Sequence, residues 1–170
     1  MVFVLFRTIV WSTLFVAVVL WFVPAQILAA AGIRGPSSFG AWQIAGLVVG
    51  LPGLALALTC IVTFTFVGRG TPAPFDPPRR LVVRGPYCLV RNPMYLGAWL
   101  FIVGFALFYR SAGSALYALA FIAVMHTFVV LYEEPTLRQT FGHDYDAYLH
   151  RTGRWWPFPR GTTLNERMDS

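Results

Sequence analysis

The chain has 170 residues, of which 57% are hydrophobic and only 12% are charged, and its mean hydropathy is +0.63. A soluble domain carries about 25% charged residues, so this composition excludes an ordinary water-soluble protein and favours one compact membrane domain. The formal charge of +6 comes from Arg alone, because the chain contains no Lys. In a soluble chain this charge would suggest nucleic-acid binding, but membrane topology explains it here and we expect no nucleic-acid partner.

Four apolar runs approach or exceed the length that crosses a bilayer as an α-helix. The first two run from about Thr8 to Ala31 and from about Trp42 to Val67, and the last two run from Met94 to Tyr109 and from Ala112 to Leu131. The first run is longer than the apolar part of a signal peptide, so we interpret it as a retained helix. Only two residues separate the last two runs, which predicts a short helical hairpin.

The sequence therefore predicts an all-α polytopic membrane protein with four transmembrane helices and an interfacial C-terminal segment. Residues 1–67 hold the two N-terminal helices. Residues 68–170 hold a cofactor-binding loop, the hairpin and the C-terminal segment, integrated into the same membrane domain.

Arginines are concentrated in the loop before the third run and in the C-terminal tail. These are Arg69, Arg79, Arg80, Arg84 and Arg91 in the loop, and Arg138, Arg151, Arg154, Arg160 and Arg167 in the tail. The positive-inside bias places both segments in the cytoplasm, and with four spans it places both termini there as well. All acidic residues fall on this same side, so we expect a cytoplasmic active site.

The two cysteines, Cys60 and Cys88, lie in an apolar run and in the loop before the third run. Their separation matches no metal-ligand spacing. We predict neither a disulfide nor a metal site.

The third run begins with an unusual combination of residues. Asn92 and Pro93 suit the start of a helix, because Asn can cap free amides and Pro fits the first helical position. Arg91 does not suit it, because a helix N-terminus carries partial positive charge and favours an anion. A fixed cation at this position indicates that a negative group is held nearby.

The fourth run ends in the opposite combination. Glu133 and Glu134 follow its last apolar residues, where we expect the helix to end and its dipole to favour cations. At about 1.5 Å per residue, an antiparallel hairpin brings residues 91–94 level with residues 129–133. We therefore expect Arg91 and the two glutamates to meet.

Two interpretations of this meeting carry similar weight. The first is a structural ion pair between Arg91 and one glutamate. The second is a site for a zwitterion, in which a ligand ammonium contacts Glu133 and a ligand carboxylate contacts the helix N-terminus. The methionine end of S-adenosylmethionine has both groups.

The residues around this site also follow a family pattern. It consists of Gly85-Pro86-Tyr87, Arg91-Asn92-Pro93-Met94-Tyr95-Leu96-Gly97, Glu133-Glu134, Leu137, Phe141-Gly142, Tyr145, Tyr148 and Pro157-Phe158. The pattern covers about residues 70–161 and resembles the isoprenylcysteine carboxyl methyltransferase and phospholipid methyltransferase families. The resemblance implies an integral membrane enzyme that transfers a methyl group from S-adenosylmethionine to a lipophilic substrate, either a prenylcysteine-like carboxylate or a lipid headgroup.

Carried over by position, the resemblance implies a set of cofactor contacts on both sides of the hairpin. They are Arg79, Arg80, Leu81, Val82, Tyr87, Asn92, Pro93, Met94, Tyr95 and Glu133, to which the charge argument adds Arg91.

Two positions depart from the family. Asn92 stands where His is common and does not titrate near neutral pH, and Val129 stands where the prenylcysteine enzymes have an Arg for the substrate carboxylate.

Methyl transfer from a sulfonium needs positioning and exclusion of water more than a strong base. An amine acceptor must still lose a proton, and the candidate proton acceptors are Glu134 and His126. Arg154 is a candidate for binding an anionic substrate group, although the positive-inside bias alone accounts for an Arg there.

Two alternatives stay open on the sequence alone. One is a nicotinamide-dependent membrane reductase, since steroid-reductase-type proteins share a similar C-terminal architecture. The other is a non-catalytic membrane scaffold that keeps the fold and pairs Arg91 with Glu133.

Overall fold

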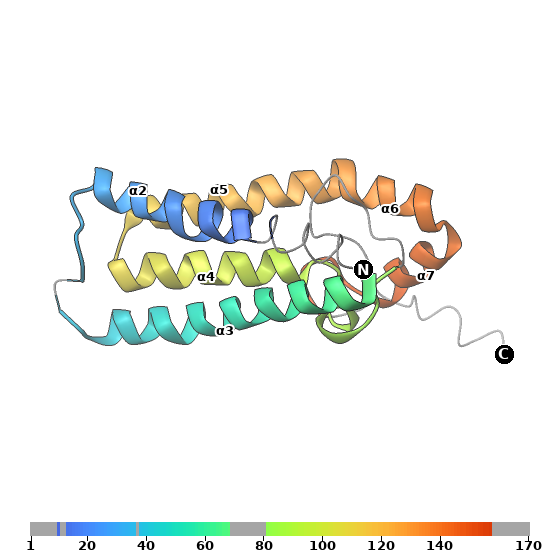
Figure 1. The fold of residues 1–170 in the computed structure, drawn as a ribbon, viewed down its shortest axis with the longest axis horizontal. Helices are drawn as coiled ribbons and strands as arrows, with labels where there is room; N and C mark the ends of the chain where they lie inside the picture. The colour runs from blue at the N-terminus through green and yellow to red at the C-terminus, as the bar shows by residue number, and fades with distance from the viewer. Residues whose placement is uncertain (1–9, 11–12, 37, 69–80, 158–170) are drawn as a thin grey trace, which may run out of the picture.

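The structure is a computed structural model that describes residue 10 and residues 13–36, 38–68 and 81–157. In this part of the chain the long helices lie lengthwise beside one another (Figure 1). Three helices, Thr13–Ala30, Ala41–Phe66 and Ala112–Phe141, are long and apolar enough to cross a membrane, and the helix Pro93–Tyr109 is shorter and equally apolar. This confirms the predicted all-α membrane fold.

The first helix consists of η1 (Val16–Phe22), which has π-helical geometry, and α2 (Val23–Ala30). Pro24 is the second residue of α2, just after the π-helical part ends at Phe22. A Pro inside a helix lacks an N–H and its ring clashes with the carbonyl four residues earlier, which the wider π turn relieves. One carbonyl in this part, that of Val19, accepts a hydrogen bond from the Tyr117 hydroxyl at 3.1 Å, which ties the first helix to α5 (Ala112–Phe128).

The second helix, α3 (Ala41–Thr63), continues into η2 (Phe64–Gly68) and packs along the whole length of α4 (Pro93–Tyr109). Glycines make the close approach possible. A Cβ on Gly104 would lie 2.4 Å from the Gly50 Cα, and a Cβ on Gly97 would lie 2.7 Å from the Gly53 carbonyl oxygen. At the far end, the Gln43 amide donates to the Phe108 carbonyl at 2.9 Å.

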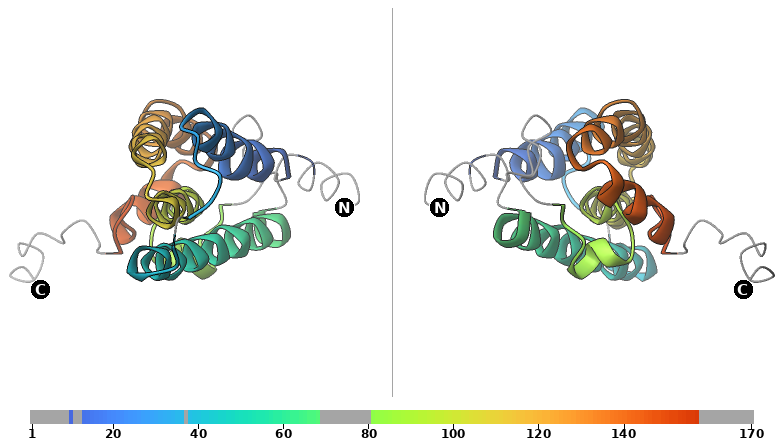
Figure 2. Two further views of the ribbon diagram at one scale, coloured as in Figure 1. Left: turned by 90° about the vertical axis from the view of Figure 1, so that its left-hand side faces the viewer. Right: turned by 90° about the vertical axis from the view of Figure 1, so that its right-hand side faces the viewer.

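The shortest of the four apolar helices, α4, is central in the bundle. It lies between α3 and α5 when the bundle is viewed from its end (Figure 2), and none of its residues is exposed. It ends at Arg110, which adopts the left-handed conformation at φ 52°, and Ser111 then begins α5, with its Oγ accepting from the Ser114 amide at 3.2 Å. The predicted two-residue hairpin is therefore confirmed.

The last membrane helix extends further than the sequence predicted. It continues from α5 through η4 (Val129–Glu133), another π-helical turn, into α6 (Glu134–Phe141). Pro135 is again the second residue after the π turn, and the helix widens in that turn instead of ending. The expectation that Glu133 and Glu134 close the helix and oppose its dipole is therefore wrong, because both lie within a helix that continues to Phe141.

The chain turns at Gly142, whose φ of 49° suits a residue without a side chain, and forms the short helix α7 (His143–Arg151). Residues 152–157 then return across the beginning of α4. The Arg91 amide donates to the Gly153 carbonyl at 2.9 Å, and Val90 and Gly153 form an isolated parallel bridge. We call residues 152–155 the strap.

Candidate functional site

Four segments meet at the polar end of the bundle: the beginning of α4, the junction of η4 and α6, the strap, and the 3₁₀ turn η3 (Gly85–Cys88). They bring together five side chains, which we call the charged cluster. These are Arg91, Tyr95, Glu133, Glu134 and Arg154. The hairpin thus places residues 91–95 level with the two glutamates, close to the depths that the helix rise predicts.

Glu134 is paired with two arginines. The Arg154 Nε and Nη2 donate to its two carboxylate oxygens at 2.7 and 2.8 Å, a bidentate arrangement, and the Arg91 Nη1 lies 3.2 Å from Oε1. Bidentate pairs of this kind are the stronger charge-assisted hydrogen bonds. Two adjacent guanidinium groups favour the ionised carboxylate, so the geometry does not favour the predicted role of Glu134 as a proton acceptor. The hydrogen bonds to Glu134 in turn raise the pKa of Arg154.

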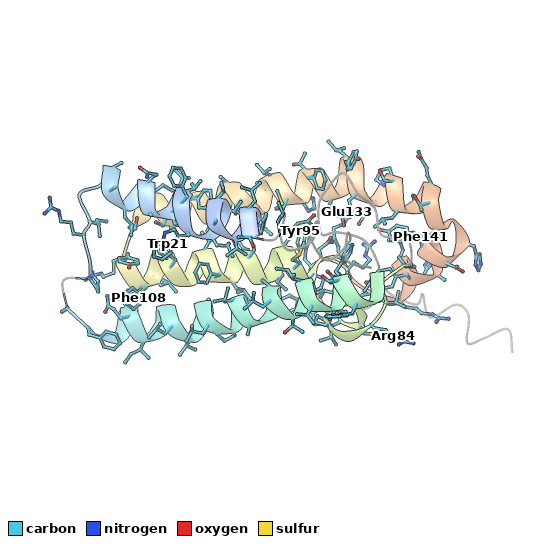
Figure 3. The ribbon with its side chains drawn as sticks, viewed as in Figure 1. Trp21, Arg84, Tyr95, Phe108, Glu133 and Phe141 are labelled. Atoms are coloured by element: carbon cyan, nitrogen blue, oxygen red, sulfur yellow. The ribbon has the colours of Figure 1, made fainter. Side chains whose placement is uncertain are left out.

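Glu133 has a different environment, although it is the next residue. Its Oε2 accepts a hydrogen bond from the Tyr95 hydroxyl at 3.2 Å, and the two side chains face each other between α4 and the last membrane helix (Figure 3). No Arg, Lys or His of the described residues lies within ion-pair distance of it. Glu133 is therefore a carboxylate whose negative charge the described part of the protein does not match with a cation.

Arg91 is almost fully enclosed, with 7% of its surface exposed. Its Nε and Nη1 are buried without a hydrogen-bond partner in the part of the chain that the structure describes, because the 3.2 Å approach of Nη1 to Glu134 is not aligned as a hydrogen bond. A buried donor without an acceptor costs about 1–3 kcal/mol, and more when the group is charged. Among the described residues, the site therefore contains donors of Arg91 that have no acceptor and, at Glu133, a carboxylate that has no cation.

Asn92 does not cap α4 with its side chain, contrary to expectation. Its Nδ2 donates instead to the Arg154 carbonyl in the strap at 3.3 Å. Pro93, which has no N–H, occupies the first helical position as predicted. The first amides of a helix have no partner within it, so those at Met94 and Tyr95 receive no acceptor from Asn92.

The loop side of the site is built around Tyr87. Its ring lies in a buried cluster with Cys60 and Val82, against which Met94 packs, and its carbonyl accepts from the Tyr148 hydroxyl at 2.6 Å. Burial raises the pKa of Tyr148, so its phenol stays neutral and able to donate. Leu81 is half-buried beside Val82. The predicted contacts Arg79 and Arg80 lie outside the described residues.

His126 lies apart from the charged cluster. It is exposed on α5, and its Nδ1 accepts a hydrogen bond from the Trp155 Nε1 at 3.0 Å. This contact fastens the strap to α5. The geometry therefore favours a positioning role over the predicted catalytic role.

Sequence reasoning missed the strap and its partners. The pairing of Arg154 with Glu134, the Trp155 contact with His126 and the Tyr148 contact with Tyr87 all join residues that are distant in the sequence. The one available signal was the spacing of Tyr145 and Tyr148, which puts two aromatic side chains on one face of α7. Both are buried.

Comparison with known proteins agrees with this architecture. Residues 41–144 match the family model of phospholipid methyltransferases. A curated relative, the nickel-cobalt-cadmium resistance protein NccN of Alcaligenes xylosoxydans xylosoxydans, is 33% identical over 144 residues, covering 81% of this chain and 63% of the relative. A solved structure of the eukaryotic intramembrane Ras methyltransferase ICMT (isoprenylcysteine carboxyl methyltransferase) superposes with a TM-score of 0.55 and 26% identity, covering 71% of this chain and 43% of that one.

The fold and the charged cluster define an all-α membrane protein with a polar site at one end of its bundle. The family model covers well over half of the chain. The chain belongs to the phospholipid methyltransferase family. It spans less than two thirds of the length of the relatives it matches.

Proposed function

We propose that this protein transfers a methyl group from S-adenosylmethionine to a lipophilic substrate at the membrane. The observation that carries the proposal is the imbalance in the charged cluster: among the described residues, Arg91 has buried donors without acceptors, and Glu133 is a carboxylate without a cation. A zwitterion corrects both. The amino-acid end of S-adenosylmethionine carries an ammonium for Glu133 and a carboxylate for Arg91 and the first amides of α4.

The same contacts argue against the scaffold alternative. A scaffold would need only the ion pair that Arg91 makes, and that pair is formed with Glu134, which Arg154 already holds through two hydrogen bonds. Glu133 has no role in that arrangement. A carboxylate near a membrane surface that no cation of the described residues pairs with is costly to keep, which supports a ligand-binding role.

The chemistry that S-adenosylmethionine supplies is a methyl group on a positively charged sulfur. When bound, it would supply that methyl group to the acceptor atom and would leave as the neutral sulfide, with the electron pair of the broken carbon–sulfur bond. Glu133 and Arg91 orient the donor, and the strap over the beginning of α4 excludes water. A carboxylate acceptor needs no base, whereas an amine acceptor must also release a proton. A role for Arg154 in substrate binding stays a prediction, since Glu134 matches its charge.

The proposal is tested by titrating the purified protein in detergent with S-adenosylmethionine and, separately, with the reduced nicotinamide cofactor. We expect binding of the first alone. Glu133→Gln is expected to weaken that binding at least about tenfold, because a charge-assisted hydrogen bond contributes about 1.5–3 kcal/mol. The variant should keep the thermal stability of the wild type, because Gln can still accept from Tyr95.

Asp144→Asn is the matched control, since Asp144 is an exposed carboxylate on α7, outside the charged cluster. It should bind S-adenosylmethionine as the wild type does. Binding of the nicotinamide cofactor without S-adenosylmethionine would reject the proposal in favour of the reductase. Unchanged affinity in Glu133→Gln, or its unfolding, would favour the scaffold.

A further inference from the structure

The charged cluster is closed in the described conformation. The Arg91 Nε and Nη1, which have no hydrogen-bond partner among the described residues, are also buried, and so is the neighbouring Asn92. A ligand carboxylate can therefore reach these two nitrogens only after a covering segment moves. One of the four segments around the cluster must move to admit it.

Three of these segments are held by extensive packing. The beginning of α4 packs closely on α3 at Gly97 and Gly53, and the junction of η4 and α6 lies within one continuous helix. The turn η3 contains Tyr87, which is buried and accepts a hydrogen bond from Tyr148 of α7. The strap is irregular, so it can move without breaking a helix. It is the segment that moves at the lowest cost.

Individual polar contacts hold the strap in place. Its backbone carbonyls accept hydrogen bonds from the beginning of α4, and the Arg154 guanidinium pairs with Glu134. A further contact lies outside the charged cluster, where the Trp155 Nε1 donates to the His126 Nδ1 at 3.0 Å. His126 precedes Glu134 by eight residues, or roughly 10–12 Å along the last membrane helix. The strap is therefore fastened at two levels of this helix.

The contact between His126 and Trp155 suits a connection that opens and closes. His126 is exposed on a helix that is apolar enough to cross a membrane, where a polar ring is costly and is often functional. Because the His126 side chain is exposed, its hydrogen bond can break and re-form without leaving a cavity in a packed core. It can fix the strap and still release it.

We propose that the strap is a movable cover of the cofactor site and that His126 and Trp155, which we call the latch, hold it closed. The inference rests on the proposed function for the identity of the ligand. When the latch and the pair of Arg154 with Glu134 open, the strap leaves the beginning of α4 and exposes Arg91. When both re-form, the strap excludes water from the site. His126 is thus a positioning residue that acts through Trp155.

The first readout is hydrogen exchange at the Arg91 amide, in the full chain in detergent and without S-adenosylmethionine. This amide donates to the Gly153 carbonyl at 2.9 Å, so its exchange reports opening of the strap. His126→Phe and Trp155→Phe should each accelerate the exchange about two- to twelvefold, the range for one neutral hydrogen bond. The double variant should show no further acceleration, because both changes remove the same contact. His126→Asn, whose side-chain oxygen can replace the Nδ1 acceptor, should keep the wild-type rate.

The matched control is Thr127→Val. Thr127 is the next residue, is also exposed, and donates to the Ala123 carbonyl within its own helix at 3.0 Å. This variant should leave the exchange of the Arg91 amide unchanged. The Leu96 amide, which donates to the Asn92 carbonyl in the first turn of α4, is the internal control and should exchange equally in all variants.

The second readout is the rate of S-adenosylmethionine binding and release. The strap must open for both steps, and the latch holds it closed in both states. Loss of the latch should therefore accelerate association and dissociation by the same factor, about two- to twelvefold, and leave the Kd unchanged. A merely structural defect would raise the Kd instead, as would the loss of a cofactor contact in Glu133→Gln.

Unchanged exchange at Arg91 in both single variants would overturn the latch. Equal acceleration at Leu96 would also overturn it, because the beginning of α4 would then be unfolding. Faster exchange at Arg91 with unchanged binding and release rates would overturn the role of the strap as a cover. If His126→Phe does not fold, Trp155→Phe tests the same hydrogen bond. A wild type that binds no S-adenosylmethionine would reject the proposed function, whereas the exchange at Arg91 decides the latch by itself.

Discussion

Glu133 and Glu134 are adjacent in the sequence and differ in almost every contact. Glu134 holds two arginines through its carboxylate, whereas Glu133 accepts only from the Tyr95 hydroxyl among the described residues. Consecutive helical residues point in directions about 100° apart, so one glutamate faces the strap and the other faces α4. We infer a structural role for Glu134 and a binding role for Glu133.

Glu134→Gln should therefore lower stability, in contrast to Glu133→Gln. The change leaves Arg91 and Arg154 without their shared anion, and Arg91 is 7% exposed. Removing one partner of a buried pair costs several kcal/mol, and because the Glu134 side chain is 18% exposed we expect about 2–3 kcal/mol. Thermal denaturation in detergent measures the effect.

The control for this variant is Asp146→Asn, which breaks the exposed pair of Arg138 and Asp146 at 2.9 Å. An exposed pair contributes less than about 1 kcal/mol, so the melting temperature should hardly change. Equal melting temperatures for Glu134→Gln and the wild type would contradict a structural role for Glu134.

At the level of the elements, the position of α4 follows from its short length and from the glycines on its surface. It has 17 residues, and the backbones of α3 and α4 approach closely at Gly50, Gly53, Gly97 and Gly104. Such small-residue contacts are a common way to pack helices in a membrane, where the hydrophobic effect does not drive association. This packing fixes the depth of the beginning of α4 and with it the position of Arg91.

Gly104→Ala tests this packing. The added Cβ would meet the Gly50 backbone at 2.4 Å, and a backbone neighbour cannot move aside as a flexible side chain can. We expect a loss of about 1–3 kcal/mol or more, seen as a lower melting temperature in detergent. Gly35→Ala is the control, because a Cβ there meets nothing within 4 Å and should leave the melting temperature unchanged. A stable Gly104→Ala variant would show that the two helices pack less closely than described.

At the level of the whole molecule, the polar groups of the described residues are unevenly distributed along the bundle. The charged cluster, the strap and α7 share the end at which α4 begins, and the turn at Arg110 lies at the opposite end (Figure 1). The excess of Arg near the first end predicts that it faces the cytoplasm. This orientation is a prediction from charge alone.

The two cysteines test the orientation without any added label site. Cys88 is exposed at the polar end, and Cys60, on α3, is fully buried against Val82 and Tyr87. A membrane-impermeant maleimide should label Cys88 in inside-out vesicles and not in sealed right-side-out vesicles, and Cys88→Ser should abolish labelling. Labelling of Cys88 in right-side-out vesicles would place the polar end outside the cell.

The sequence allowed prediction of the four helices, the two-residue hairpin and the approximate meeting of Arg91 with the glutamates, because hydropathy and helix rise are local properties. It did not allow prediction that the last membrane helix continues to Phe141. A Pro after two glutamates indicates the end of a helix. Here the helix instead continues, because a π turn accommodates the Pro.

The partner of each glutamate could also not be predicted from the sequence. Helix rise gives depth but not direction, and the π turn before Glu134 changes the direction in which both carboxylates point. The strap was missed because an irregular segment has no periodicity to detect, and its contacts with Arg91 and Asn92 are made by backbone carbonyls.

The most direct test of the central claim is transfer of labelled methyl from S-adenosylmethionine into a total lipid extract by the purified protein. We expect label in the lipid fraction with the wild type and with Asp144→Asn, and at least about tenfold less with Glu133→Gln at limiting cofactor. A folded wild-type protein that transfers no label, or a Glu133→Gln variant that transfers as much as the wild type, would contradict the account.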